Sequence, residues 1–330
     1  MNMHKLYRAL GALGALALLL PSLSRAAGDA GSCRYVPIAK LDINTSEQRL
    51  PTLTGSINGK PAPMLIDTGA YESRLLRQGA ERLGLALEGT GRYSYGVGGA
   101  AVTYRAYVDD FAVGNSHTGR TVVPVIDITS FKPNFDAIVG ADTLLQTDME
   151  LSMADKYVQF FRASGCGDTF LGYWDPNAME IPFIGKEGSS NKPFVAVELN
   201  GVKLKAILDT GALATVVMRH AAERAGVRLD APGARKAGKA SGVGDKAVDE
   251  WIVDFKRFSI GDETVNNPRL IVSAEAPSGE EEVDVILGDD FLRAHHILFA
   301  MSQDRLYLSY LGGELIGAQQ QALPAPVKAP

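Results

Sequence analysis

Two stretches of the chain read M-L-I-D-T-G-A, at residues 64–70, and A-I-L-D-T-G-A, at residues 206–212. In each stretch an apolar run typical of a buried strand ends at an aspartate, and a glycine two positions later permits a close turn of the backbone. One such turn is an ordinary way to end a strand. Two of them in one chain indicate a site where two carboxylates meet, Asp67 from the first stretch and Asp209 from the second.

The similarity between the two stretches continues on both sides of them. The matched segments, in chain order, are N-G at 58–59 and 200–201, A-E-R-L-G-L at 80–85 and A-E-R-A-G-V at 222–227, Y-G-V-G at 95–98 and S-G-V-G at 241–244, F-A-V-G at 111–114 and F-S-I-G at 258–261, and I-V-G-A-D at 138–142 and I-L-G-D-D at 286–290. The offset between matched positions grows only from 142 to 148 residues. The chain therefore contains one domain twice, which is too few copies for a solenoid.

Bulk composition indicates a soluble globular protein. The 330 residues provide enough chain for two cores of ordinary domain size, and the apolar fraction of 46% and charged fraction of 22% are those of folded soluble proteins. The net charge is −5 and no basic cluster stands out in the sequence, which argues against a nucleic-acid partner.

The first residues have the features of a secretory signal peptide. Lys5 and Arg8 make a positive start, residues 9–20 form an apolar run, and small residues at 24–26 suit cleavage after Ala26. The apolar run is too short to span a bilayer. We therefore expect residues 1–26 to be removed and the protein to be exported, periplasmic or secreted, with no membrane attachment afterwards. An uncleaved N-terminal anchor is the alternative.

Two cysteines, Cys33 and Cys166, remain after the predicted cleavage. An even number of cysteines in an oxidising compartment predicts one disulfide, and two free thiols are the alternative. Neither cysteine has the neighbours of a metal-binding or redox motif.

The pattern of short strands and turn signals predicts a mainly β fold. We expect an N-terminal lobe at 34–162, a linker rich in glycine and proline at 163–192, a C-terminal lobe at 193–315 and a disordered tail at 318–330. Within the first copy, the predicted elements are a hairpin turning at 58–59, a strand at 63–66, a helix at 75–83 ending before Gly84, a glycine-rich hairpin tip at 93–100, strands at 102–108, 121–126, 137–139 and 157–161, and a short helix capped by Asp142.

Two related copies can pack about a pseudo-two-fold axis and bring Asp67 and Asp209 together. Two adjacent carboxylates cannot both ionise cheaply, so one keeps its proton and the other stays charged. The charged group can take a proton from a bound water while the neutral group donates one to a carbonyl oxygen, which hydrolyses an amide without a covalent intermediate. The backbone at Gly69 and Gly211 can approach the carboxylates closely.

Together, D-T-G-A, a glycine-rich hairpin and a closing I-[VL]-G-x-D-x-L at 138–144 and 286–292 resemble the pepsin and retropepsin superfamily of aspartic proteases. The motif D-T-G-A resembles that of the retroviral branch. The presence of both lobes on one chain resembles pepsin. The resemblance covers residues 49–162 and 193–311. It implies a bilobal acid-protease fold with two homologous, closed-barrel-like lobes, pseudo-two-fold symmetry and a cleft between the lobes.

The resemblance also implies an aspartic endopeptidase that uses Asp67 and Asp209 to activate water. The residues that it assigns to supporting the pair are Thr68, Gly69, Thr210, Gly211, Gly140 and Gly288, with the two threonines bonded across the axis. The residues that it assigns to the flaps and substrate binding are Tyr95, Gly96, Gly98, Gly242 and Gly244. A peptide-binding relative without catalysis and a hydrolase of cell-wall peptide amides are the alternative functions.

The two expected flaps differ, because Tyr95 precedes the first G-x-G and Ser241 precedes the second. Tyr95 matches the flap tyrosine of pepsin-like enzymes and would close over substrate; a hairpin aromatic without a special partner is the alternative. Ala70 and Ala212 stand where pepsins place a hydroxyl beside each carboxylate. Fewer hydrogen bonds to the charged form predict a working pH less acidic than that of pepsin.

Other motifs predict no further chemistry. The glycine pattern at 96–101 precedes an alternating strand rather than a helix, so it does not indicate a dinucleotide site. His295 and His296 are adjacent and do not share a helical face, so we expect no metal. We expect no cofactor, a peptide or protein substrate as the partner, and a monomer.

Overall fold

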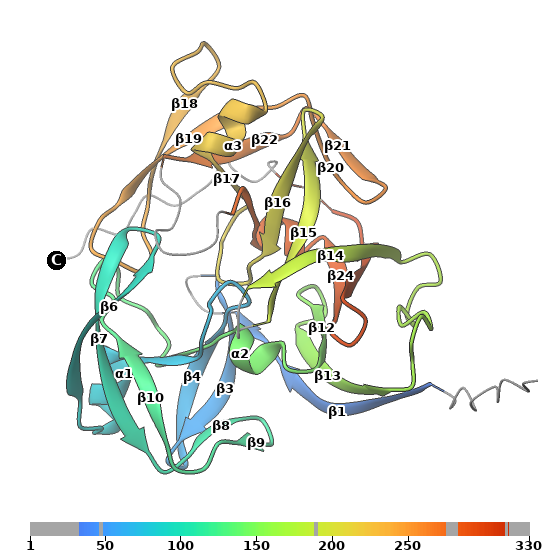
Figure 1. Ribbon diagram of the computed structural model, residues 1–330. Helices are drawn as coiled ribbons and strands as arrows, with labels where there is room; N and C mark the ends of the chain where they lie inside the picture. The colour runs from blue at the N-terminus through green and yellow to red at the C-terminus, as the bar shows by residue number, and fades with distance from the viewer. Residues whose placement is uncertain (1–32, 46–48, 188–190, 275–282, 314–315, 317–330) are drawn as a thin grey trace, which may run out of the picture. The chain divides into compact units, whose positions relative to one another are not determined.

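The computed structural model describes residues 33–45, 49–187, 191–274, 283–313 and 316 (Figure 1). The predicted signal peptide at 1–26 and the predicted tail at 318–330 lie outside these residues. Both copies of the repeat fall within one structural unit, which begins at Cys33.

The described residues form a mainly β protein, as the sequence predicts. The first copy contains β1 (Arg34–Asp42), β2 (Asn44–Thr45), β3 (Pro51–Ile57), β4 (Lys60–Ile66), β5 (Arg74–Leu76), α1 (Arg77–Leu83), β6 (Glu88–Gly96), β7 (Gly99–Val108), β8 (Phe111–Val113), β9 (Ser116–His117), β10 (Thr121–Ile126), β11 (Ala137–Val139), α2 (Ala141–Leu144), β12 (Asp148–Ser152) and β13 (Tyr157–Ser164).

The second copy repeats the same series of elements. It contains β14 (Met179–Glu187), β15 (Lys192–Leu199), β16 (Val202–Leu208), β17 (Val216–Met218), α3 (Arg219–Arg224), β18 (Arg235–Ala240), β19 (Val248–Asp254), β20 (Arg257–Ile260), β21 (Glu263–Asn266), β22 (Arg269–Ser273), β23 (Val285–Leu287), α4 (Asp289–Leu292), β24 (His295–Ala300) and β25 (Arg305–Tyr310). The elements from β3 to β13 correspond one to one with those from β15 to β25.

The two N-G pairs form the same tight turn. Asn58 and Gly59 have φ of 50° and 73°, and Asn200 and Gly201 have φ of 52° and 84°. Positive φ at both central residues gives the turn whose twist matches a hairpin, and asparagine and glycine tolerate it best. The turns join β3 to β4 and β15 to β16, which are the strands that lead to the two D-T-G-A stretches.

The helix predicted at 75–83 starts two residues later than expected. Residues 74–76 form strand β5, which pairs with both β10 and β11, and α1 occupies Arg77–Leu83. Pairing of β5 inside the sheet outweighs the helical spacing of its side chains. The helix ends as predicted, because Gly84 adopts a left-handed φ of 75° and its N–H bonds the Ala80 and Glu81 carbonyls.

The strands form two sheets rather than closed barrels, and the expectation of closed-barrel-like lobes is wrong. The ten-stranded sheet follows the order β6-β7-β10-β5-β11-β4-β3-β8-β9, with β2 beside β3, and its end strands β6 and β9 do not pair. The fifteen-stranded sheet runs from β1 at one end to β18 at the other, with β20 and β21 beside β15. In both sheets the flap strand β6 or β18 is an end of the order, so hydrogen bonding does not return to the starting strand.

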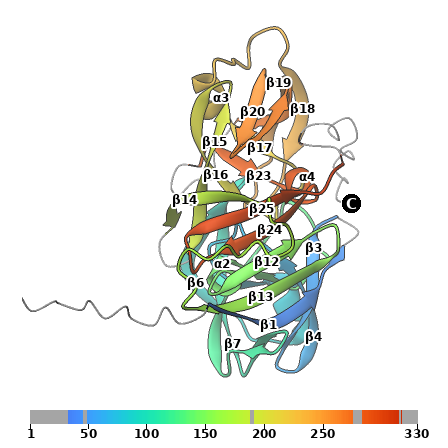
Figure 2. The same ribbon diagram turned by 90° about the vertical axis from the view of Figure 1, so that its right-hand side faces the viewer.

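Strands from both copies pair in the middle of the larger sheet. Figure 2 shows β1, β13, β12, β24, β25 and β14 side by side, in the order that their pairing gives. The contact between copies is antiparallel pairing of the equivalent strands β12 and β24, with Met149 opposite Phe299 and Ser152 opposite His296. Antiparallel pairing of equivalent strands is what a two-fold relation between the copies produces.

The segment at 163–192, expected to link the copies, contains β14. This strand is the counterpart of β1: β1 pairs with β13, and β14 pairs with β25. The later residues of β14 also pair with β15, so the strand joins the central strands to the sheet of the second copy. In the first copy the same run is interrupted at Ile43, between β1 and β2, which leaves the first copy with a separate sheet.

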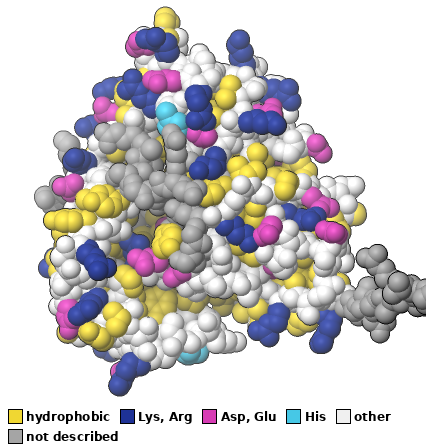
Figure 3. All heavy atoms as spheres, in the orientation of Figure 1, with side chains coloured by type: hydrophobic (Ala, Val, Ile, Leu, Met, Phe, Trp, Pro, Cys, Tyr) yellow, Lys and Arg dark blue, Asp and Glu magenta, His cyan; other side chains and the backbone are white. Residues whose placement is uncertain are grey.

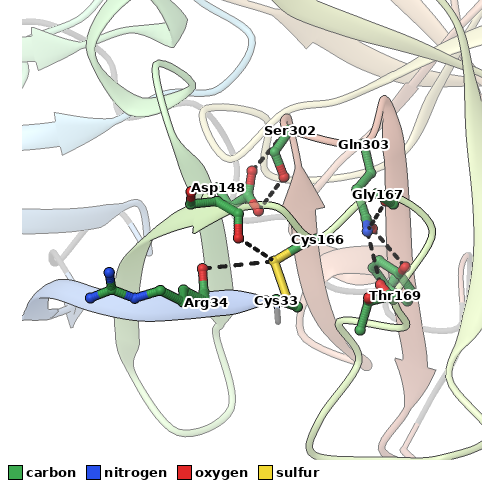
Figure 4. The surroundings of a disulfide bond; sticks show 10 residues. Cys33, Arg34, Asp148, Cys166, Gly167, Thr169, Ser302 and Gln303 are labelled. Atoms are coloured by element: carbon green, nitrogen blue, oxygen red, sulfur yellow. Dashed lines mark hydrogen bonds between the residues drawn. A yellow bond between two sulfur atoms is a disulfide. The ribbon is translucent and has the colours of Figure 1, made fainter. Parts of the chain in front are cut away.

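A disulfide joins Cys33 to Cys166 (Figure 4). Cys33 directly precedes β1, and Cys166 lies two residues after the end of β13. The turn between β24 and β25 holds the segment after Cys166, because Gln303 Nε2 donates to the carbonyls of Gly167 (2.6 Å) and Thr169 (2.8 Å). The Ser302 N–H and Oγ both donate to the Asp148 carboxylate at 2.8 Å. The cross-link therefore fastens β1 at a point where both copies meet.

The surface is mixed in charge. Figure 3 shows basic and acidic side chains interspersed over one face of the molecule. Among the described residues, no helix has the length and apolar character needed to cross a bilayer.

Candidate active site

Each D-T-G-A stretch follows a buried strand held between two neighbours. β4 pairs with β3 on one side and runs parallel to β11 on the other, and β16 is held in the same way by β15 and β23. The Asp67 N–H donates to the Val139 carbonyl at 3.0 Å, and the Asp209 N–H donates to the Leu287 carbonyl at 2.9 Å. The strands thus place the two aspartates at equivalent points of the two copies.

Two threonines join the stretches through a reciprocal set of hydrogen bonds. The Thr68 N–H donates to Thr210 Oγ1 at 3.0 Å, and the Thr210 N–H donates to Thr68 Oγ1 at 3.1 Å. The Thr68 hydroxyl donates to the Leu208 carbonyl at 2.7 Å, and the Thr210 hydroxyl donates to the Ile66 carbonyl at 2.6 Å. Both threonines are buried, so loss of any of these bonds would leave a buried polar group without a partner and lower the stability of the fold.

The glycines bring the backbone of each copy against the carboxylate of the other. A β-carbon on Gly69 would lie 2.3 Å from Asp209 Cγ, and one on Gly211 would lie 2.8 Å from Asp67 Cγ. Both separations are shorter than the non-bonded contacts that β-carbons make in real structures. Glycine is required here for close approach rather than for an unusual φ.

Each carboxylate accepts a backbone hydrogen bond from its own stretch and lies within bonding reach of the other. The Ala70 N–H donates to Asp67 Oδ1 at 2.8 Å, and the Gly211 N–H donates to Asp209 Oδ1 at 2.7 Å. The two carboxylates are also close enough for each to affect the pKa of the other. We call Asp67 and Asp209 the aspartate pair.

The electrostatics of the aspartate pair favour one shared proton. Burial raises the pKa of Asp67, and backbone and side-chain hydrogen bonds oppose the rise. Burial also raises the pKa of Asp209, and the neighbouring charge of Asp67 raises it further. Removal of the first proton leaves an anion that opposes removal of the second, so the pair titrates as a unit and holds one proton over a range of pH.

Gly140 and Gly288 support the two stretches from the start of a helix. Each is the residue preceding α2 or α4, and the next N–H donates into the D-T-G-A stretch: Ala141 to the Ala70 carbonyl (2.9 Å) and Asp289 to the Ala212 carbonyl (2.8 Å). A β-carbon on Gly140 would lie 2.7 Å from the backbone of Glu72, and the equivalent atom on Gly288 would lie 2.3 Å from the Ala214 carbonyl oxygen. The two glycines therefore pack against the residues that follow Asp67 and Asp209 in the chain.

A second symmetric set of bonds holds the residues that follow D-T-G-A. The Ser73 N–H and hydroxyl both donate to Asp142 Oδ1, and the Thr215 N–H and hydroxyl both donate to Asp290 Oδ1. The expectation that Asp142 caps a helix is therefore wrong. Asp142 is the second residue of α2, and its carboxylate faces Ser73 instead of the helix N-terminus.

The glycine-rich tips of the β6–β7 and β18–β19 hairpins touch each other. We call residues 96–99 and 242–244 the flap tips. The Lys246 N–H donates to the Gly98 carbonyl at 3.0 Å, and a β-carbon on Gly96 would lie 2.7 Å from Val243 Cβ. Gly98 and Gly244 have φ of 99° and 115°, which side chains other than glycine rarely adopt. The Ser130 hydroxyl also donates to the Gly242 carbonyl at 2.6 Å.

The residues preceding the two flap tips differ in kind. Tyr95 lies near the end of β6 and is 52% exposed, and Ser241 follows β18 and is also exposed. Within the described part of the chain, no hydrogen bond of the Tyr95 hydroxyl is recorded. The proposed closing of Tyr95 over substrate stays a prediction.

Sequence reasoning missed Lys192. This residue opens β15 and is 1% exposed, and its ammonium group donates to the Gly69 carbonyl at 3.1 Å. Its charge lowers the pKa of both members of the aspartate pair. Comparison of the two copies could have drawn attention to Lys192, because it occupies the position of the apolar Leu50 in the first copy, at the offset of 142.

The two adjacent histidines, His295 and His296, bond to different acidic side chains. No group of three or more metal-ligating side chains occurs within the described ranges. His295 Nε2 pairs with Glu263 Oε2, and His296 Nε2 pairs with Glu150 Oε1, each at 2.9 Å, so the adjacent histidines serve different partners.

Comparison with known protein families identifies the fold family. A family model described as aspartyl protease matches residues 53–143 and again residues 195–291, which together make up more than half of the chain. No curated protein matches the chain significantly. The two matched regions contain the two D-T-G-A stretches at corresponding positions. The chain belongs to the retropepsin-like aspartyl protease family, with the family domain present twice.

Proposed function

We propose that the protein is an aspartic endopeptidase whose aspartate pair activates a water molecule. The observation that carries the proposal is the reciprocal junction of the two D-T-G-A stretches, where Thr68 and Thr210 are bonded across and Gly69 and Gly211 pack against the opposite carboxylates. Membership of the aspartyl protease family supports the same reaction class.

The proposed reaction uses the single proton of the aspartate pair. The ionised carboxylate takes a proton from water, and the resulting hydroxide attacks the peptide carbonyl carbon. The protonated carboxyl donates its proton to the carbonyl oxygen, which gives a neutral tetrahedral diol. The carboxyl that now holds the proton donates it to the amide nitrogen, and the ionised carboxylate takes a proton from one hydroxyl of the diol. The C–N bond breaks, the acid and the amine leave, and the pair again holds one proton. Asp67 and Asp209 retain some exposed surface, which gives water a route to them.

The proposed substrate is an extended peptide that lies between the aspartate pair and the flap tips. Flap strands β6–β7 and β18–β19 offer backbone groups to which such a peptide can add as a further strand. The flap tips must separate for it to enter, because Lys246 and Gly98 are bonded across them. One chain supplies both carboxylates, so we propose that a monomer is active.

Export is a further part of the proposal. The disulfide between Cys33 and Cys166 suits an oxidising compartment such as the periplasm or the extracellular space. The predicted signal peptide at 1–26 agrees with this assignment.

Cleavage of a diverse peptide pool tests the proposal. The mature chain is assayed between about pH 3 and 8, the range that brackets a shared-proton pair, beside Asp67→Asn and Asp209→Asn. Asp109→Asn is the control, since Asp109 is an exposed aspartate paired with Arg120. We expect bell-shaped activity that both pair variants abolish and the control retains.

A parent protein that binds peptides without cleaving them at any pH contradicts the endopeptidase proposal. That result identifies the chain as a peptide-binding relative. Cleavage that persists in both pair variants assigns the hydrolysis to another site.

A further inference from the structure

Lys192 is a lysine buried next to the aspartate pair. Its side chain belongs to the first residue of β15 and is 1% exposed. Its Nζ lies 3.1 Å from the carbonyl oxygen of Gly69, which is in the D-T-G-A stretch of the other copy. A buried ammonium group is costly unless nearby groups compensate its charge.

The contact at Gly69 brings the ammonium group close to the carboxylates. Gly69 packs on Asp209 so tightly that a β-carbon would lie 2.3 Å from Asp209 Cγ. Gly69 also follows Asp67 by two residues in the chain. The Lys192 charge acts favourably on the ionised form of both aspartates.

The first copy has no lysine at the corresponding position. Pro51 matches Pro193, so Leu50 is the counterpart of Lys192, and Leu50 is buried in an apolar cluster with Leu65 and Leu76. The fold therefore accommodates an apolar side chain at this point. A charged residue in only one copy makes an otherwise symmetric centre unsymmetric.

We propose that Lys192 is an electrostatic positioning residue, which anchors the Gly69 carbonyl and sets a fixed positive charge beside the aspartate pair. This inference rests on the proposed endopeptidase function. Burial alone would hold both carboxyls protonated to high pH, and Lys192 offsets part of that effect. The charge keeps one carboxylate ionised, and so able to accept a proton from water, at lower pH than burial alone would allow.

Other charged groups near the centre do not substitute for Lys192. Asp142 of α2 and Asp290 of α4 accept hydrogen bonds from Ser73 and Thr215, which follow the two D-T-G-A stretches. Both are acidic, so any long-range effect of their ionised forms opposes that of Lys192. The charge of Lys192 is among the strongest influences on the pKa of both members of the pair.

The test compares three lysine variants in the cleavage assay across pH. Lys192→Leu introduces the residue of the first copy, and Lys192→Arg keeps the charge. Lys60→Met is the matched control, because Lys60 also donates to a backbone carbonyl, that of Leu83 at 3.1 Å. Lys60 is exposed and opens β4, at the end of the strand away from Asp67. Removing a nearby positive charge raises both pKa values of the pair.

We expect Lys192→Leu to shift both limbs of the pH profile upward by roughly one pH unit. Lys192→Arg and Lys60→Met should keep the midpoints of the parent. Unchanged midpoints in Lys192→Leu overturn the inference. Equal shifts in the leucine and arginine variants also overturn it, because they assign the effect to packing rather than charge.

A direct titration separates this inference from the proposed function. The aspartate carboxyl carbons are followed by NMR from about pH 3 to 9, the range in which a shared-proton pair titrates, and those of the pair are assigned by their loss in Asp67→Asn and Asp209→Asn. Midpoints that rise in Lys192→Leu support the role of Lys192 even if the parent cleaves nothing. Midpoints that stay in place overturn it even if the parent is an active peptidase.

Discussion

The two copies of the domain share their framework and differ at the centre. In the first copy Arg82 pairs with Asp136, and in the second Arg224 pairs with Asp284 at the corresponding positions. Near the centre the copies do not agree: Leu50 directly precedes β3 in the first copy, and Lys192 is the first residue of β15 in the second. The framework must keep two equivalent stretches in register, whereas the chemistry of one shared proton is itself unsymmetric.

The flaps repeat this contrast. Both tips are G-V-G hairpins in contact with each other, but Tyr95 precedes one and Ser241 the other. Backbone geometry is thus retained in both copies where the copies touch. The residues that precede the tips, Tyr95 and Ser241, are not retained in the same way.

The largest effect is expected from adding a methyl group at the paired glycines. Gly69→Ala would place its β-carbon 2.3 Å from Asp209 Cγ, and Gly211→Ala would place it 2.8 Å from Asp67 Cγ. Displacing a reacting carboxylate by about 1 Å lowers kcat/KM by about 100-fold. We expect at least this loss in both variants, and the greater loss in Gly69→Ala.

Gly89→Ala is the control, since a β-carbon there meets no atom within 4 Å. Steady-state kinetics on one cleaved peptide measures the three variants. Equal activity of Gly69→Ala and the parent contradicts the packing of Gly69 on Asp209.

The next effect concerns β1 and β14, the equivalent strands on either side of the run β13-β12-β24-β25. The disulfide fastens β1 to the end of β13, whereas β14 continues through the chain into β15. Replacing Cys33 and Cys166 by serine frees a cross-link between residues 133 positions apart. We expect the free energy of unfolding to fall by about 3 kcal/mol.

Hydrogen exchange locates the loss. Backbone amides of β1 should exchange faster in the serine variant while those of β14 keep their protection. Equal acceleration in both strands means that the disulfide stabilises the whole sheet rather than β1.

A smaller effect is expected at the threonines that join the copies. Thr68→Val and Thr210→Val each remove a hydroxyl that donates to a carbonyl of the other copy and accepts an N–H from it. Two unsatisfied buried groups reduce stability by about 2 kcal/mol. The symmetry predicts similar losses for the two single variants.

The double variant should lose less than the sum of the two, because the two hydroxyls are in contact at 3.5 Å and substitutions at residues in contact are not additive. Denaturant unfolding measures all three, with the exposed Thr54→Val as the control. Clearly unequal single losses would show that the junction is not symmetric in energy.

The smallest effect is expected at Glu250, where the two copies differ on a flap strand. Glu250 is opposite Ser273 in β19–β22, and its counterpart opposite Ile126 in β7–β10 is Thr103. Burial raises the pKa of Glu250 from 4.5 to about 7. The unfolded chain loses this proton first as pH rises, so Glu250 lowers stability progressively between those two pKa values.

Glu250→Gln removes that penalty. Relative to the parent, we expect the free energy of unfolding of the variant to be higher by about 1 kcal/mol at pH 8 and the same at pH 4. The partial exposure of the side chain keeps the difference at pH 8 this small. Thermal unfolding across pH measures the difference. A difference that is the same at both pH values contradicts the raised pKa.

Local sequence was sufficient for the parts of the structure that depend on neighbours in the chain. The N-G turns at 58–59 and 200–201, the apolar runs before Asp67 and Asp209, and the end of α1 at Gly84 all follow from residue type and spacing. The duplication adds a long-range expectation, because equivalent residues can meet on a two-fold axis. This expectation predicts the hydrogen bonds between Thr68 and Thr210.

Only the tertiary structure decided how the copies join and what surrounds the aspartate pair. The pairing of β12 with β24, the place of β14 in the sheet and the open strand orders depend on contacts between distant segments, which periodicity does not encode. Lys192 lies 123 residues from Gly69 in the chain, and a lysine at the start of a strand normally indicates an exposed position. Its role emerged because the fold buries it against the stretch that carries Asp67.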